Sequence, residues 1–147
     1  MATRTPVPSG AGARPGSARD RGTVEELHVL SRPLPSTVAA ARLARVAVRV
    51  AVRAWRLPGV EERAALVVSE AVTAVLRHAD PGGLALAVRT TRRRLRLEVR
   101  CSGGLPAALA SAGPDDADCA AVLDATATRW GTCDGGRVLW AELALPA

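Results

Sequence analysis

Two runs in the second half of the chain alternate between large apolar residues and small or polar ones: "LALAVRT" (84–90) and "RLRLEVR" (94–100). A period of two is the pattern of a β-strand with one buried face. The short connection "TTRR" between the runs predicts an antiparallel hairpin. A second hairpin is expected over 129–145, around its Asp-Gly-Gly turn. The apolar face of such a sheet requires a covering layer.

The first half of the chain supplies helices for that layer. Segment 37–57 is ambiguous, because its valines alternate as in a strand while its arginines recur at steps of three and four. An unbroken strand of this length would be rare, so a helix is predicted, with Ser36 as its N-cap. The side opposite the arginines is expected to be buried: Leu43, Ala47, Val48, Ala51, Ala54 and Trp55.

A second helix is predicted from Val60 to His78, and a third from Asp118 to Thr128. The core stripe of the second helix is expected to be Val60, Ala64, Val67, Val68, Ala71 and Val75, with a second apolar patch at Ala65, Val72 and Leu76.

An edge strand is expected at 23–31, which gives the order β-α-α-β-β-α-β-β. The predicted fold class is therefore α+β, a two-layer sandwich with helices on one face of a mixed, mostly antiparallel sheet. Residues 1–22 are rich in Pro, Gly, Ser and Arg and are expected to form a disordered tail. Residues 23–147 would then form one domain.

The composition limits the core and the compartment. Phe and Tyr are absent from the 147 residues, so the core must rest on Val, Leu and Ala. Three cysteines without a Cys-x-x-Cys pair favour a reducing cytoplasm. No apolar run is long enough to span a membrane, and the first residues lack the apolar region of a secretory signal. We therefore expect a cytoplasmic protein without a membrane partner.

The charge permits several partners. All 20 basic residues are arginines, and the net charge of +6 is compatible with an acidic protein or a nucleic acid. Single-stranded nucleic-acid sites usually interleave basic residues with stacking aromatics, and none stands within the basic run at 92–100. A solvated strand face explains the run at 92–100 as well as a binding patch does.

Three stretches carry a family resemblance: "AWRLP" (54–58), "LVVSEAVTAVLRHA" (66–79) and "RWGTCDGGRVLWAEL" (129–143). Together they resemble the small ATP-binding proteins of the anti-sigma-factor serine-kinase type. Those proteins belong to the superfamily of gyrase, heat-shock chaperone and histidine-kinase ATPase domains (GHKL, with the Bergerat fold). The resemblance covers residues 36–145 and implies a two-layer α/β sandwich.

The resemblance also implies where a nucleotide would bind. In that family a Glu on the second helix acts as a base, and an Asn one turn later holds Mg²⁺. Here Glu70 occupies the first position and Ala74 the second, and a methyl group cannot coordinate Mg²⁺. The family's adenine-binding Asp corresponds to Cys101, a poorer hydrogen-bond acceptor, and the glycine turn that follows keeps Gly103.

The family's third motif is a Gly-x-Gly turn at the phosphates. Its glycines correspond to Ala117 and Cys119, whose side chains would block a close approach. The resemblance thus implies a degenerate member with no ATP or Mg²⁺; if the site were retained, these would be its cofactors. Glu70 would then be a vestigial base, paired with Arg77 or another arginine.

Three functions remain open. The first is a regulator that binds a sigma factor or an anti-anti-sigma-like protein, as a monomer or homodimer, through the arginines of the first helix: Arg42, Arg45, Arg49 and Arg53. The second is an ATP-dependent protein serine kinase with Glu70 as base. The third is nucleic-acid binding through Arg92, Arg93, Arg94 and Arg96. Cys101 and Cys119 could also form a redox pair, or a metal site with His78, although buried thiols are the commoner state.

Overall fold

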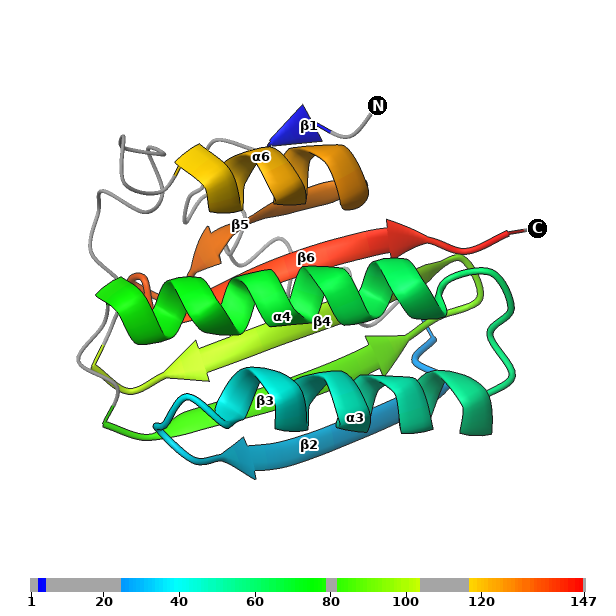
Figure 1. The fold of residues 1–147 in the computed structure, drawn as a ribbon. Helices are drawn as coiled ribbons and strands as arrows, with labels where there is room; N and C mark the ends of the chain where they lie inside the picture. The colour runs from blue at the N-terminus through cyan, green and yellow to red at the C-terminus, as the bar shows by residue number, and fades with distance from the viewer. Residues whose placement is uncertain (1–2, 5–24, 79–81, 104–116, 147) are drawn as a thin grey trace.

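The computed structural model describes residues 3–4, 25–78, 82–103 and 117–146. Its sheet has the strand order β1-β5-β6-β4-β3-β2 (Figure 1). The strands are β1 (Thr3–Arg4), β2 (His28–Leu34), β3 (Leu84–Thr90), β4 (Arg94–Cys101), β5 (Arg129–Cys133) and β6 (Val138–Ala144). All neighbouring strands are antiparallel except β1, which runs parallel to β5. Both predicted hairpins, β3–β4 and β5–β6, are confirmed.

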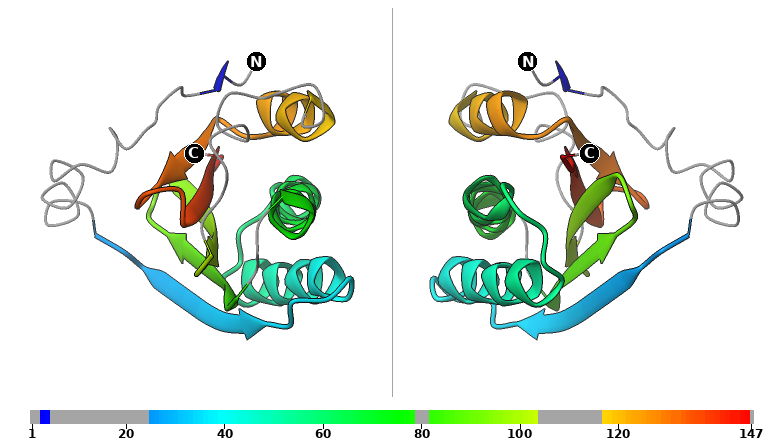
Figure 2. Two further views of the ribbon diagram at one scale, coloured as in Figure 1. Left: turned by 90° about the vertical axis from the view of Figure 1, so that its left-hand side faces the viewer. Right: turned by 90° about the vertical axis from the view of Figure 1, so that its right-hand side faces the viewer.

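Three helices lie on one face of this sheet (Figure 2): α3 (Ala40–Ala54), α4 (Glu61–His78) and α6 (Ala117–Thr126). The two-layer α+β prediction is confirmed. The Asp-Gly-Gly turn between β5 and β6 has Gly135 and Gly136 at φ +66° and +83°, a backbone conformation that glycine adopts without strain. The helix-facing residues of β4, which are Leu95, Leu97 and Val99, are buried as the alternation predicts.

The core stripe predicted for α4 is confirmed. Val60, Ala64, Val67, Val68, Ala71 and Val75 are all buried, and so are Ala65 and Val72 of the second patch. Burial on two sides follows from the position of α4, which packs against α3 on one side and α6 on the other, above β4 and β6 (Figure 1).

One prediction for α3 is wrong, and another is confirmed only in part. Its N-cap residue is Ala39, and the Ser36 hydroxyl instead donates a hydrogen bond to the Gly82 carbonyl at 3.3 Å. Of the side expected to be buried, Val48 and Ala51 are buried and Ala47 and Trp55 are half-buried against the core, whereas Leu43 and Ala54 are exposed. The buried stripe also includes Ala40, Ala44 and Val52. The buried face is therefore rotated from the one expected, because the arginines flank the contact with α4 instead of lying opposite the core.

The two edges of the sheet differ. At one edge, β2 pairs with β3 alone, and most of its residues are exposed. His28 at its start stacks on Trp55 just after α3, with ring centroids 5.0 Å apart. At the other edge, Thr3 and Arg4 pair with Arg129 and Trp130 of β5. These two residues belong to the segment expected to be a tail, of which residues 5–22 lie outside the described part.

Candidate functional site

The helix α4 carries the first two positions at which the resemblance implies nucleotide chemistry. Glu70 is half-buried, and Ala74 is only 2% exposed within the core cluster. One helical turn separates them, so both lie on the same side of the helix. At position 74 the helix therefore presents a methyl group packed among apolar neighbours and no oxygen.

The end of β4 carries the third position. The Cys101 side chain is fully buried in the core, and the backbone amide of this residue donates to the Arg137 carbonyl at 2.8 Å. A depression of about 370 Å³ opens beside it, lined by Gly83, Leu84, Ala85, Arg100, Cys101, Ser102 and Arg137. Neither Glu70 nor Ala74 lines this depression, so it does not join the α4 positions to Cys101 in one described pocket.

The remaining positions are described less completely. Gly103 follows Ser102 at the exposed end of β4. Ala117 and Cys119 lie in the first turn of α6, but their side chains fall outside the described part of the structure, as does that of His78. The alternative in which Cys101, Cys119 and His78 form one site is therefore not tested by the described side chains. Among the described residues no group of three potential ligands could hold a metal ion.

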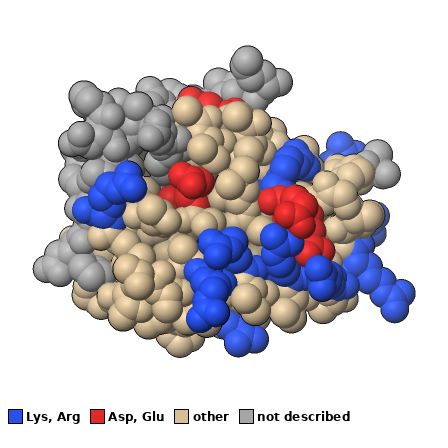
Figure 3. Space-filling view, in the orientation of Figure 1, with Lys and Arg blue, Asp and Glu red and all other residues tan. Residues whose placement is uncertain are grey.

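Arg49 and Arg53 of α3 contact the acidic start of α4. Figure 3 shows basic side chains around acidic ones on this face of the molecule. Arg49 donates to Glu62 at 2.7 Å and to Glu61 at 3.0 Å, and Arg53 donates to Glu61 at 2.7 Å. The hydrogen bond from Arg53, followed by that from Arg49, lowers the pKa of Glu61. Arginines expected to meet a partner are thus already engaged within the chain.

The other two arginines of the stripe differ from these. Arg45 donates to the Ser69 hydroxyl at 2.9 Å, whereas exposed Arg42 has no ion-pair partner in the described parts of the chain. Among the described residues, no carboxylate neutralises the charge of Arg42 or Arg45, because Arg45 donates to a neutral hydroxyl.

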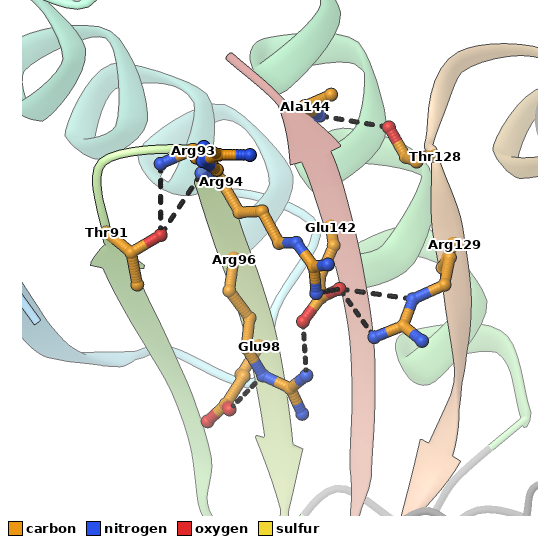
Figure 4. Close-up of polar contacts among 9 residues, drawn as sticks. All are labelled: Thr91, Arg93, Arg94, Arg96, Glu98, Thr128, Arg129, Glu142 and Ala144. Atoms are coloured by element: carbon orange, nitrogen blue, oxygen red, sulfur yellow. Dashed lines mark hydrogen bonds and ion pairs between the residues drawn. The ribbon is translucent and has the colours of Figure 1, made fainter. Parts of the chain in front are cut away.

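An ion-pair network that the sequence did not predict lies on the sheet face opposite the helices (Figure 4). Glu142 of β6 stands directly across from Arg96 of β4 on one side and Arg129 of β5 on the other. Arg96 and Arg129 donate to its carboxylate at 3.0 and 2.9 Å, and Arg94 does so at 3.4 Å. Arg96 also donates to Glu98 at 2.7 Å.

Trp140 packs within this network. The guanidinium carbon of Arg96 lies 4.6 Å from its ring centroid and that of Arg129 lies 5.8 Å away, distances suited to cation–π contact. Trp140, Glu98 and Glu142 are buried beneath arginine side chains, whereas Arg94 and Arg100 are exposed, so the solvated strand face expected for 92–100 is confirmed only in part. Strand register, which the sequence did not provide, is what brings these side chains together.

Electrostatics within the network favour the charged forms. Burial alone would raise the pKa of Glu142, but the hydrogen bond from Arg129 and the charges of Arg129 and Arg96 outweigh it, so the pKa is lowered. Burial would likewise lower the pKa of Arg96, but the hydrogen bond and charge of Glu98 raise it overall. The network therefore remains ionised at neutral pH, and its two carboxylates offset two of the three positive charges of Arg94, Arg96 and Arg129.

The same network bears on nucleic-acid binding. Of the four arginines proposed for that role, Arg94 and Arg96 are engaged with Glu142 and Glu98. Arg92 and Arg93, in the turn between β3 and β4, have no ion-pair partner among the described residues. Two free guanidinium groups offer little phosphate neutralisation compared with the several contacts of typical nucleic-acid sites.

The described elements define an α+β, two-layer domain with an ion-paired outer sheet face and an exposed helical edge. A comparison with models of known protein families found no family that matches, and a search of curated proteins found no match. Within the described ranges, no helix has the length and apolarity needed to cross a membrane.

Proposed function

We propose that this chain is a regulatory protein of the anti-sigma type that acts by binding another protein and has lost the ATP chemistry of the proteins it resembles. The observation that carries the proposal is the burial of Ala74 and Cys101, a methyl group and a thiol at the positions of a metal ligand and an adenine ligand. Mg²⁺ requires oxygen ligands, and neither side chain supplies one.

The energetic argument is independent of the overall fold. A hydrogen bond to a charged group contributes about 1.5–3 kcal/mol, and a micromolar site has about 8 kcal/mol in total. Loss of the adenine acceptor and of the metal ligand would together remove a large part of that total. Glu70 without a metal beside it then serves the packing of α4 and not phosphoryl transfer.

Calorimetric titration with ATP and Mg²⁺ tests the proposal directly. The natural chain is expected to give no saturable heat up to about 1 mM ATP. A dissociation constant of about 1 mM corresponds to about 4 kcal/mol of binding free energy, about half that of a micromolar site. A triple variant, Ala74→Asn, Cys101→Asp and Cys119→Gly, restores the family's residues and is expected to gain binding if it folds. Its thermal unfolding curve serves as the folding control.

The natural chain alone decides the outcome. Saturable submillimolar binding of ATP to it would refute the proposal and favour the kinase alternative, with Glu70 as base. A duplex DNA titration at low salt examines the third alternative, because phosphate contacts give a steep salt dependence. Salt-sensitive, saturable DNA binding would also contradict the proposal.

A further inference from the structure

The exposed apolar side chains of the described chain are unevenly distributed. Seven large ones are exposed, and six of these lie on β2, on α3 or just beside them: Leu27, Val29, Val38, Leu43, Val46 and Val50. The seventh, Leu66, lies on α4. Scattered single apolar residues are normal on a protein surface, but a contiguous group marks an interaction site.

Three of these residues form a stripe along α3. Leu43, Val46 and Val50 are 42%, 53% and 58% exposed and follow the i, i+3, i+7 spacing of one helical face. At about 100° per residue, Val46 lies roughly 60° and Leu43 and Val50 lie roughly 100–120° around the helix from Arg49. Arg45, which contacts Ser69 of α4, lies on the opposite side of Arg49. This stripe, which we call the α3 flank, is therefore turned away from α4, toward the free edge of β2.

We infer that the α3 flank binds an acidic amphipathic helix of a partner protein. This inference rests on the proposed function and names the chemistry of the partner. The flank is about 10 Å long, which matches two turns of a second helix packed beside it. Leucine-type residues at the same spacing on the partner would cover Leu43, Val46 and Val50.

The positive charge of α3 favours a negatively charged partner. The helix α3 contains four arginines and no acidic residue. Arg42 adjoins the flank without an ion-pair partner in the described ranges, and Arg53 is 71% exposed even though it contacts Glu61. Carboxylates bordering the apolar face of a partner helix would meet these guanidinium groups.

Two other occupants fit less well. A partner strand would have to pair with the free edge of β2. Pro33 in this strand has no backbone N–H to donate, and proline on an edge strand typically blocks the addition of another strand. A second copy of this chain would bring the arginines of two α3 helices together, and like charges repel. An acidic amphipathic helix would cover the apolar stripe and pair its carboxylates with the arginines beside it.

A peptide titration tests the inference. The probe is a fluorescent, 18-residue helical peptide with Leu at positions matching the stripe and Glu on both sides of it; the control peptides are a scrambled form and one with Lys for Glu. We expect saturable anisotropy with the Leu/Glu peptide alone. Val46→Asp should weaken that binding at least about tenfold, since it places a charge in the centre of the contact.

Leu66→Asp is the matched control variant, because Leu66 is similarly exposed, at 44%, but lies on α4. It is expected to leave the affinity unchanged, and circular dichroism verifies that both variants fold. No saturable binding to the natural chain, equal binding of the Lys peptide, or equal loss with Leu66→Asp would overturn the inference. Concentration-dependent dimers that Val46→Asp abolishes in sedimentation equilibrium would overturn it in favour of a second copy. None of these outcomes depends on the ATP titration.

Discussion

Replacing Glu142 with glutamine probes the network on the outer sheet face with the least change in shape. Glutamine retains one acceptor oxygen but removes the negative charge to which Arg129, Arg96 and Arg94 donate. The Glu142 side chain is 11% exposed, whereas Arg129 and Arg94 are 51% and 57% exposed and Arg96 only 29%. The pair with Arg96 should therefore dominate the effect.

These exposed fractions determine how much stability Glu142→Gln is expected to lose. Exposed pairs contribute about 0.2–1 kcal/mol each, and a shielded charge-assisted hydrogen bond contributes about 1.5–3 kcal/mol. Arg96 would keep its 2.7 Å contact with Glu98, so the substitution does not strand a buried cation, which would cost about 3–5 kcal/mol. We expect Glu142→Gln to lower the free energy of unfolding by about 2 kcal/mol at pH 7.

The pH dependence follows from the lowered pKa of Glu142. Between its folded pKa and its ordinary value of about 4.3, the folded chain binds fewer protons than the unfolded chain, so stability rises with pH in that window. The stabilisation is complete above about pH 5 and is lost as the pH falls through the folded pKa. The difference between the natural chain and Glu142→Gln should accordingly shrink in acid.

Urea unfolding followed by circular dichroism at pH 7 and at decreasing pH measures both effects. Glu62→Gln is the control, because Glu62 is 82% exposed and its loss should leave the unfolding midpoint nearly unchanged. Equal stability of Glu142→Gln and the natural chain at pH 7 would refute the assigned network. A deficit that persists undiminished well below the folded pKa would refute the role of ionisation.

Three further outcomes are expected. Asp124→Ala should lower the free energy of unfolding by about 1–3 kcal/mol in urea titrations, because it removes the carboxylate to which the Trp130 Nε1–H donates at 2.7 Å. His28→Ala should remove a stacking contact with Trp55 worth about 0.5–1.5 kcal/mol and speed amide exchange in β2. Burial raises the pKa of the Cys133 thiol, so alkylation followed by mass spectrometry at pH 8 should label it more slowly than a free cysteine.

The sequence predicted the elements that depend on local pattern. The alternation in 84–90 and 94–100 correctly identified both strands and their inward residues, and the stripe from Val60 to Val75 correctly identified the buried face of α4. These predictions succeed because periodicity directly reports which side of an element is buried. The same reasoning gave the two-layer α+β architecture.

Features that depend on long-range contacts could not be predicted in this way. Register between β4, β5 and β6 places Glu142 between Arg96 and Arg129, and no local pattern encodes register. The face of α3 was misjudged for a related reason: Leu43 was assigned to the core because it is apolar and lies opposite arginines. The acids that hold Arg49 lie on another helix, so the arginine stripe did not mark the solvent side.

Charge alone is therefore a poor guide to the binding surface of this chain. Most arginines of α3 and β4 contact other residues of the same chain and are therefore structural. What distinguishes α3 from the rest of the described surface is its exposed aliphatic side chains. These side chains are on the side of α3 turned away from α4, whereas Ala74 and Cys101 are buried on α4 and at the end of β4. Because the two sets of residues do not overlap, the partner binding that we propose for the α3 flank does not require a functional nucleotide site.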